Sequence, residues 1–167
     1  QYVNAGGNRD VLKIELNYSL RAHIFEPVRR EVLTDIFDDT FAVLILDPIE
    51  IFAAKANALM SRAAARDLYD FNNMIENRLF SDETRELFRK SIIFYNTISQ
   101  ETVNKTFDTS AIDKLSFSKI RRDLFPVLKK KDNFDLEGRK EEAKKYIQDL
   151  MQVTDDEMKY MTSFENK

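Results

Sequence analysis

The chain has 167 residues, of which 33% are charged, and its formal net charge is −3 at pH 7. It has no cysteine, which excludes disulfides, thiolate metal sites and cysteine nucleophiles, and its single histidine, His23, has no second histidine with which to bind a metal. No apolar run approaches the roughly 20 residues of a membrane span, and the charge gives no global basic field for nucleic acids. We therefore expect a cytoplasmic protein without membrane association.

Several segments before residue 47 are predicted to be extended. Apolar and polar residues alternate over 11–19, which is typical of a half-buried strand, and the apolar run 41–46 predicts a more buried strand. Residues 22–25 form a short extended piece, and 28–37 are compatible with either a helix or a strand. Because two or three strands alone form a marginal sheet, we expect this sheet to be incomplete.

The first predicted helix has a clear start signal. Asp47 is a good N-cap, Pro48 suits the first helical position, and Glu50 completes a capping box. The helix is expected to reach about Arg62 and a second to cover roughly 64–77, unless the alanines at 63–65 keep the two continuous. Apolar residues at helical spacing define the buried face of the first helix: Ile49, Phe52, Ala53, Ala56, Leu59 and Met60.

From Ser81 onward every predicted element is helical. Amphipathic patterns predict helices over 82–99, 116–128 and 136–152, and Thr154 with Glu157 forms a capping box for a last short helix. The expected fold is therefore α+β and mainly helical, with a small sheet followed by a helical bundle. The apolar stripe of the helix over 82–99 contains Leu87, Ile92, Phe94 and Tyr95.

A dense cluster of charge surrounds the end of the first helix. On one helix, Lys55, Arg62 and Arg66 fall within a narrow arc, where three cations repel one another unless an anion lies over them. A triphosphate would supply that anion, with arginine binding it as a fork and lysine as a point charge. Alternatively, Asp67 and Asp70 neutralise the arginines in a structural ion network, in which surface pairs contribute roughly 0–1 kcal/mol each.

The other candidate sites have less support from spacing. Glu15, on the polar face of its strand, is either a ligand of a divalent cation or an exposed glutamate, and magnesium usually needs further oxygen ligands. Asp35, Asp38 and Asp39 lack the glycine and distal glutamate of a calcium loop, so they are interpreted as a solvated turn. Gly6-Gly7 matches no phosphate-binding fingerprint and is interpreted as a flexible turn.

Some of these residues carry a resemblance to a known family. The motifs are Lys-Ile-Glu-Leu-Asn at 13–17, Ile-Phe-Ala-Ala-Lys at 51–55, Ala58-Leu59, Arg62 and Arg-Asp-Leu-Tyr-Asp at 66–70. Over about residues 11–78 the chain resembles the carboxy-terminal half of AbiEii/AbiGii-type nucleotidyltransferase toxins, which belong to the polymerase-β-like superfamily and to abortive-infection systems. The resemblance implies a partial nucleotidyltransferase-like core at 1–80, with an incomplete sheet, followed by a helical domain at 81–167.

The resemblance also implies roles for particular residues. Lys55 matches the helix lysine that faces the nucleotide and Asp67 a later essential acidic position, so both are expected to be catalytic, while Glu15 matches a third carboxylate that holds magnesium. The implied reaction is in-line transfer of a nucleotidyl group from an NTP. The implied partners are an antitoxin protein and, as acceptor, a tRNA or another RNA. Three residues would support the site or bind the nucleotide: Arg62, Arg66 and Asp70.

One part of the family pattern is absent from the sequence. The family places a glycine turn and an Asp-x-Asp pair tens of residues before the position that Glu15 matches, and only fourteen residues precede it. We therefore expect a fragment of a longer parent that uses magnesium and NTP, and no turnover by this chain as given. The alternative is a non-enzymatic helical interaction module. Convergence of Lys55, Arg66 and Asp67 on one concave pocket would favour the enzyme.

Overall fold

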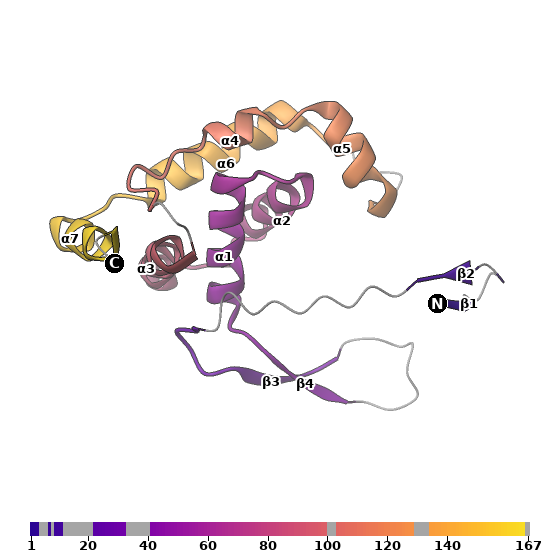
Figure 1. Ribbon diagram of the computed structural model, residues 1–167, viewed down its shortest axis with the longest axis horizontal. Coiled ribbons are helices and arrows are strands. Elements are labelled where there is room, and N and C mark those ends of the chain that lie inside the picture. The colour runs from indigo at the N-terminus through magenta and orange to yellow at the C-terminus, as the bar shows by residue number, and fades with distance from the viewer. Residues whose placement is uncertain are drawn as a thin grey trace.

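The computed structural model describes residues 1–3, 7, 9–11, 22–32, 41–99, 103–128 and 134–165. In this part of the chain the protein is α+β and mainly helical, as predicted, with helices that surround a central α1 and two small sheets beside them (Figure 1). The elements in chain order are β1 (Tyr2–Val3), β2 (Arg9–Asp10), β3 (Val28–Glu31), β4 (Ala42–Ile45), α1 (Pro48–Ser61), α2 (Ala65–Glu76), α3 (Asp82–Ser99), α4 (Ser110–Asp113), α5 (Phe117–Asp123), the 3₁₀ helix η1 (Phe125–Val127), α6 (Leu136–Leu150) and α7 (Asp155–Glu165).

Each sheet consists of two antiparallel strands. β1 pairs with β2, and β3 pairs with β4 in a register that places Val28 opposite Ile45. The strand predicted at 41–46 is confirmed as β4, but the prediction that it is more buried is wrong, because Leu44 is 67% exposed. A two-stranded ribbon has little apolar cover of its own, so part of its side chains faces solvent.

Two sequence predictions fall outside the described residues. Except for Val11, the strand expected at 11–19, with Glu15, is outside the described residues. The same holds for the predicted turn that contains Asp35, Asp38 and Asp39. The predicted metal ligand therefore has no described position relative to the rest of the site.

The start of α1 confirms the cap but not the capping box. The Asp47 carboxylate accepts the N–H of Ile49 at 2.8 Å, and Pro48 occupies the first turn. Glu50 was predicted to bond back to the cap, and this prediction is wrong. Its side chain turns away from the helix start, because three donors from other segments surround it.

These donors form what we call the Glu50 network, which consists of Glu50, Tyr95 and the backbone of Ile24 and Phe25. The Glu50 carboxylate accepts the N–H of Ile24 at 2.6 Å, the N–H of Phe25 at 3.4 Å and the hydroxyl of Tyr95 at 2.5 Å. Burial raises the pKa of Tyr95, and its hydrogen bond to the carboxylate raises it further. The network ties the segment before β3 to both α1 and α3.

α1 and α2 are separate helices that meet at a corner. Ala63 has a positive φ of 46°, a left-handed conformation that interrupts the helix. The backbone N–H of Arg62 and that of Ala63 both bond to the carbonyl of Ala58, which completes the last turn of α1. The prediction of two helices is therefore confirmed, and the alternative of one continuous helix is wrong.

The helices enclose one hydrophobic core. α1 packs against α2, α3 and α4, α2 packs against α5 and α6, and α7 packs against α3 (Figure 1). The predicted face of α1 is confirmed, since Ala53, Ala56 and Leu59 are fully buried, but in α3 Leu87 is 41% exposed and Phe88 takes its place in the core. Core residues lie on both sides of residue 80, and the predicted boundary between 1–80 and 81–167 stays a prediction.

The capping box predicted for the last helix is confirmed. The N–H of Glu157 bonds to the Thr154 hydroxyl at 3.3 Å, and the N–H of Thr154 bonds to the Glu157 carboxylate at 2.9 Å. The helix predicted at 116–128 is shorter than expected: α5 ends at Asp123, and Pro126 lies in the 3₁₀ turn that follows. The four-residue α4 was not predicted, because one turn is too short to show a helical period.

Candidate functional site

The charged residues singled out around the end of the first predicted helix line one pocket of about 740 Å³, at the corner between α1 and α2. Its other side is formed by α5 and η1, which follow about fifty residues later in the chain. We call it the ionic pocket, and its lining consists of Lys55, Arg62, Ala64, Ala65, Arg66, Asp67, Asp70, Arg122, Asp123, Pro126 and Val127.

Lys55 and Asp70 form an ion pair across the corner. The Lys55 ammonium lies 2.5 Å from the Asp70 carboxylate, and the two side chains are 33% and 36% exposed. Because the pair is reached by solvent, it contributes little stability and either partner can exchange for another ion. Lys55 is thus held at the pocket by a carboxylate in a solvated ion pair.

Asp67 holds the corner between the two helices. Its carboxylate accepts Nε of Arg62 at 3.0 Å, Nη2 of Arg62 at 3.3 Å and the backbone N–H of Ala64 at 3.3 Å. A carboxylate in the first turn of α2 is also favoured by the helix dipole. The hydrogen bond and the charge of Asp67 raise the pKa of Arg62, so this guanidinium is firmly cationic.

Arg66 is positioned differently from the other two cations. Its Nε donates a long hydrogen bond of 3.4 Å to the backbone carbonyl of Asp123. Within the described residues no carboxylate lies at ion-pair distance from Arg66. A guanidinium held by Nε has its two terminal nitrogens available as a fork for phosphate or carboxylate oxygens.

The α5 side of the pocket carries an ion pair that the sequence did not predict. Arg122 Nε lies 2.6 Å from Asp123 Oδ1, and Arg122 Nη2 lies 2.8 Å from Asp123 Oδ2. The hydrogen bond from Arg122 lowers the pKa of Asp123, and the charges of Arg122, Arg66 and Lys119 lower it further. The only sequence signal was an Arg-Arg-Asp run on an amphipathic helix, and nothing in its spacing linked it to residues 55–70.

The three cations predicted from the sequence are therefore brought together by a different structural feature from the one expected. Lys55, Arg62 and Arg66 do line one concave surface, but the prediction that they share an arc of one helix is wrong. α1 ends at Ser61 with Arg62 as its C-cap, and Arg66 lies on α2. The turn at Ala63 and the packing of α2 on α1 bring them together instead.

The described residues do not by themselves form a magnesium site. Nowhere in this part of the chain do three acidic or histidine side chains gather at metal-binding distances. In the ionic pocket, Asp67 and Asp70 are each bonded to a cation, which leaves them poorly placed to share a metal without further ligands.

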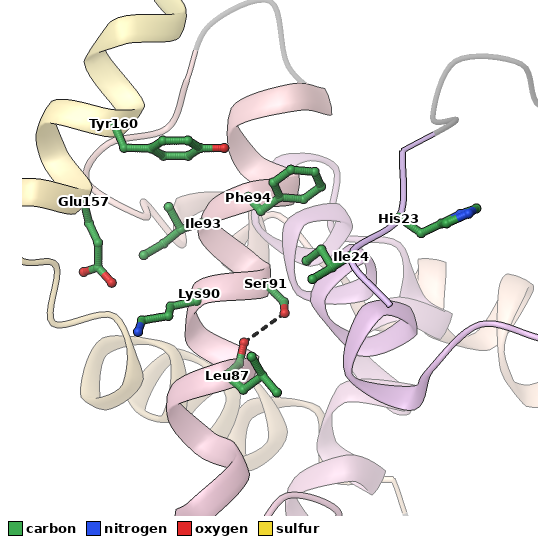
Figure 2. Close-up of a pocket in the computed structure, with 9 residues that line it drawn as sticks. All are labelled: His23, Ile24, Leu87, Lys90, Ser91, Ile93, Phe94, Glu157 and Tyr160. Carbon is green, nitrogen blue, oxygen red and sulfur yellow. Dashed lines mark hydrogen bonds between the residues drawn. The ribbon is translucent and has the colours of Figure 1, made fainter. Parts of the chain in front are cut away.

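A second pocket, of about 380 Å³, has a different character. Figure 2 shows that its side chains come from the segment before β3, from α3 and from α7, and most of them are apolar. Ser91 donates to the carbonyl of Leu87 at 2.9 Å, and the charged Lys90 and Glu157 are paired with Glu86 and Arg89. The other polar groups of this pocket are the His23 imidazole and the Tyr160 hydroxyl.

The ionic pocket combines fork-shaped and point cations with carboxylates on a helical framework, an arrangement that suits a phosphate-handling protein. In agreement with this, residues 1–166 match the family model described as nucleotidyl transferase AbiEii toxin, type IV toxin–antitoxin system, and the chain belongs to this family. The match extends well beyond residues 11–78, which carried the resemblance in sequence, and it includes α3 to α7.

Neither the curated proteins nor the solved structures contain a match to this chain. As a member of a toxin–antitoxin family, the protein is expected in general terms to have an antitoxin partner and to use nucleotides. Over the described residues, no helix is both long enough and apolar enough to cross a bilayer.

Proposed function

We propose that the ionic pocket binds the triphosphate of an NTP and serves nucleotidyl transfer. One observation carries this proposal. The same pocket is lined by Lys55 on α1, by Arg62 at the C-cap of α1 and by Arg66 on α2, although no single helix aligns them. Ligand pockets commonly measure about 300–1,000 Å³, and the ionic pocket, at about 740 Å³, has room for a nucleotide.

Lys55 and Arg66 have the main electrostatic roles in this proposal. When a triphosphate enters, the Lys55 ammonium exchanges Asp70 for a phosphate oxygen, and Arg66 binds a second phosphate through its two terminal nitrogens. During in-line transfer the acceptor oxygen bonds to the α-phosphorus and pyrophosphate leaves. Fixed cations that face the developing negative charge then lower the barrier.

Asp67 is essential in this proposal because it controls Arg62. With two hydrogen bonds to the guanidinium and one to the Ala64 N–H, its carboxylate sets both the direction of Arg62 and the shape of the corner. Asp70 acts as the counter-ion that holds Lys55 before the nucleotide binds. Magnesium, with Glu15 as one of its ligands, is a further part of the proposal.

The acceptor and the cellular setting are further parts of the proposal. We expect a tRNA or another RNA end as acceptor. Lys119 on α5 is exposed, and its charge helps to lower the pKa of Asp123 at the pocket, so this cation is near enough to favour an anionic acceptor. The antitoxin is expected to be a protein. NTP use and a nucleic-acid acceptor are consistent with a cytoplasmic location.

The alternative of a non-enzymatic interaction module predicts a different arrangement. In such a module the charges would spread into solvent for solubility, and no shared concave surface would be needed. The convergence of Lys55, Arg66 and Asp67 on one pocket supports the nucleotidyltransferase instead.

The test is nucleotide binding by the full chain, measured by titration calorimetry with each NTP. We expect binding in the wild type and roughly tenfold weaker binding in Lys55→Gln, the loss of one charge-assisted contact. Lys90→Gln is the matched control, because Lys90 is also an ion-paired helix lysine but lines the apolar pocket. Absence of NTP binding in the wild type, or equal affinities in the two variants, would contradict the proposal.

A further inference from the structure

The helical part of the chain contributes its own cation to the ionic pocket. Arg122 and Asp123 lie at the end of α5, and both line the pocket together with Lys55 and Arg66. Asp123 follows Arg66 by 57 residues in the sequence, so this side of the pocket exists only because α5 packs on α2.

We propose that Arg122 is a further phosphate-binding residue, which Asp123 holds in place until a nucleotide phosphate replaces the carboxylate. This inference rests on the proposed function, since it concerns the same pocket and the same ligand. It goes beyond it by making α5 part of the nucleotide site rather than a separate structural element.

The geometry of the Arg122–Asp123 pair supports exchange. The two-point contact, at 2.6 and 2.8 Å, occupies the face of the guanidinium that would also bind two oxygens of a phosphate. The Arg122 side chain is 73% exposed, so the pair is solvated and breaking it costs little. A phosphate group presents the same pair of oxygens with more charge, and it can therefore displace the carboxylate.

Asp123 also connects the two sides of the pocket. Its carboxylate holds Arg122, while its backbone carbonyl accepts Nε of Arg66 from α2. The two arginines are thus held by different groups of one residue, and a ligand that takes Arg122 from the carboxylate leaves the bond to Arg66 intact. The two arginines would then bind the same anion from two sides.

The charge balance of the pocket favours a polyanion. Its lining contains four cations and three carboxylates, and three of the cations already have a carboxylate partner. If the pocket were only a structural ion network, we would expect each of its cations to pair with a carboxylate. Within the described residues, Arg66 has only a backbone acceptor. The Arg122–Asp123 pair is solvated and exchangeable. Both arginines can therefore accept added negative charge.

The experiment compares two neighbouring arginines of α5 in the full chain. Arg122→Gln removes the proposed phosphate contact, whereas Arg121→Gln makes the same change of charge at an exposed residue that does not line the pocket. We expect NTP affinity to fall roughly tenfold in Arg122→Gln and by less than about twofold in Arg121→Gln. Affinity for the unphosphorylated nucleoside should be equal in both variants, which a general disturbance of α5 would not produce.

Asp123→Asn gives an independent readout in the opposite direction. It removes the competing carboxylate but keeps the carbonyl that holds Arg66, so NTP affinity should rise by a few-fold. Equal NTP affinities of Arg122→Gln and Arg121→Gln, with binding retained in the wild type, would overturn this inference and leave the proposed function standing. A wild type that binds no NTP would overturn both.

Discussion

Two groups of polar side chains on α1 are built in opposite ways. The Glu50 network, near the start of the helix, buries its carboxylate completely and satisfies it with three donors from distant segments. The ionic pocket, at the other end of the same helix, has one buried carboxylate, Asp67, but its Lys55–Asp70 and Arg122–Asp123 pairs are solvated and each carboxylate there is bonded to one cation. Both groups contain carboxylates, and we expect only the solvated ones to be released to a ligand.

Burial distinguishes the two groups of charge. Removing the buried Glu50 carboxylate would leave its donors without hydrogen bonds, so the Glu50 network resists exchange and ties segments together. A solvated ion pair contributes little to stability, so in our proposal phosphate replaces Asp70 or Asp123 in the ionic pocket. The two groups should therefore respond differently to mutation, one in stability and the other in ligand binding and activity.

The largest expected effect concerns activity. In the natural protein, Lys55→Gln should lower nucleotidyl transfer by about 10²–10³-fold, because one fixed cation that faces the developing charge is lost. Asp67→Asn should act in the same direction through the loss of control over Arg62. Transfer of label from radioactive NTP measures both, and Lys90→Gln is the control. Activity unchanged in Lys55→Gln would mean that the ionic pocket does not serve transfer.

The next effect concerns stability and the Glu50 network. Glu50→Ala should lower the free energy of unfolding by about 2–4 kcal/mol, because Tyr95 and two backbone N–H groups lose their acceptor. Urea denaturation measures the change. Glu26→Ala, an exposed glutamate just after the same segment, is the control and should change stability by less than about 0.5 kcal/mol. Similar losses in the two variants would show that the network contributes no special stability.

A smaller, pH-dependent effect is expected where α7 docks on α3. Burial alone would raise the pKa of Glu157, but hydrogen bonds from Arg89 and Thr154 lower it below its ordinary value of 4.5. Because the folded-state pKa is the lower one, this stabilisation is fully present above the ordinary value and is lost as the pH falls through the folded-state pKa.

The measurement is urea denaturation at neutral pH and at acidic pH. Glu157→Gln should lose about 1–2 kcal/mol at neutral pH, since its side chain is only 16% exposed and is bonded to Arg89. The difference from the wild type should shrink in acid. Asp156→Asn, an almost fully exposed neighbour, is the control and should show neither effect. A loss in Glu157→Gln that stays the same in acid would rule out the ionised carboxylate as its cause.

The smallest expected effect is the stability change from loss of a cation in the ionic pocket. Lys55→Gln should lower the free energy of unfolding by less than about 1 kcal/mol, because the side chains of the Lys55–Asp70 pair are 33% and 36% exposed. The same urea series measures it, beside Glu50→Ala. A loss as large as that of Glu50→Ala would show that the ionic pocket is a structural network, and the contrast between the two groups would disappear.

Local signals in the sequence determined the boundaries of several helices. Asp47 and Pro48 mark the start of α1, Thr154 and Glu157 mark the start of α7, and the residues of α3 are those predicted. These features depend on neighbours within four residues along the chain, and such contacts form wherever the segment becomes helical. Sequence motifs also pointed to the family, which the family model confirms.

Tertiary packing decided what the local signals left open. Glu50 satisfies the local rule for a capping box, yet donors from Ile24 and Tyr95, at the distances of true hydrogen bonds, take its carboxylate instead. Arg122 reaches the pocket because α5 packs on α2, a contact between segments that no periodicity in the chain reveals. The sequence alone thus determined where several helices begin and which residues carry charge, whereas only the packing of distant segments decided which charges are buried and which share a pocket.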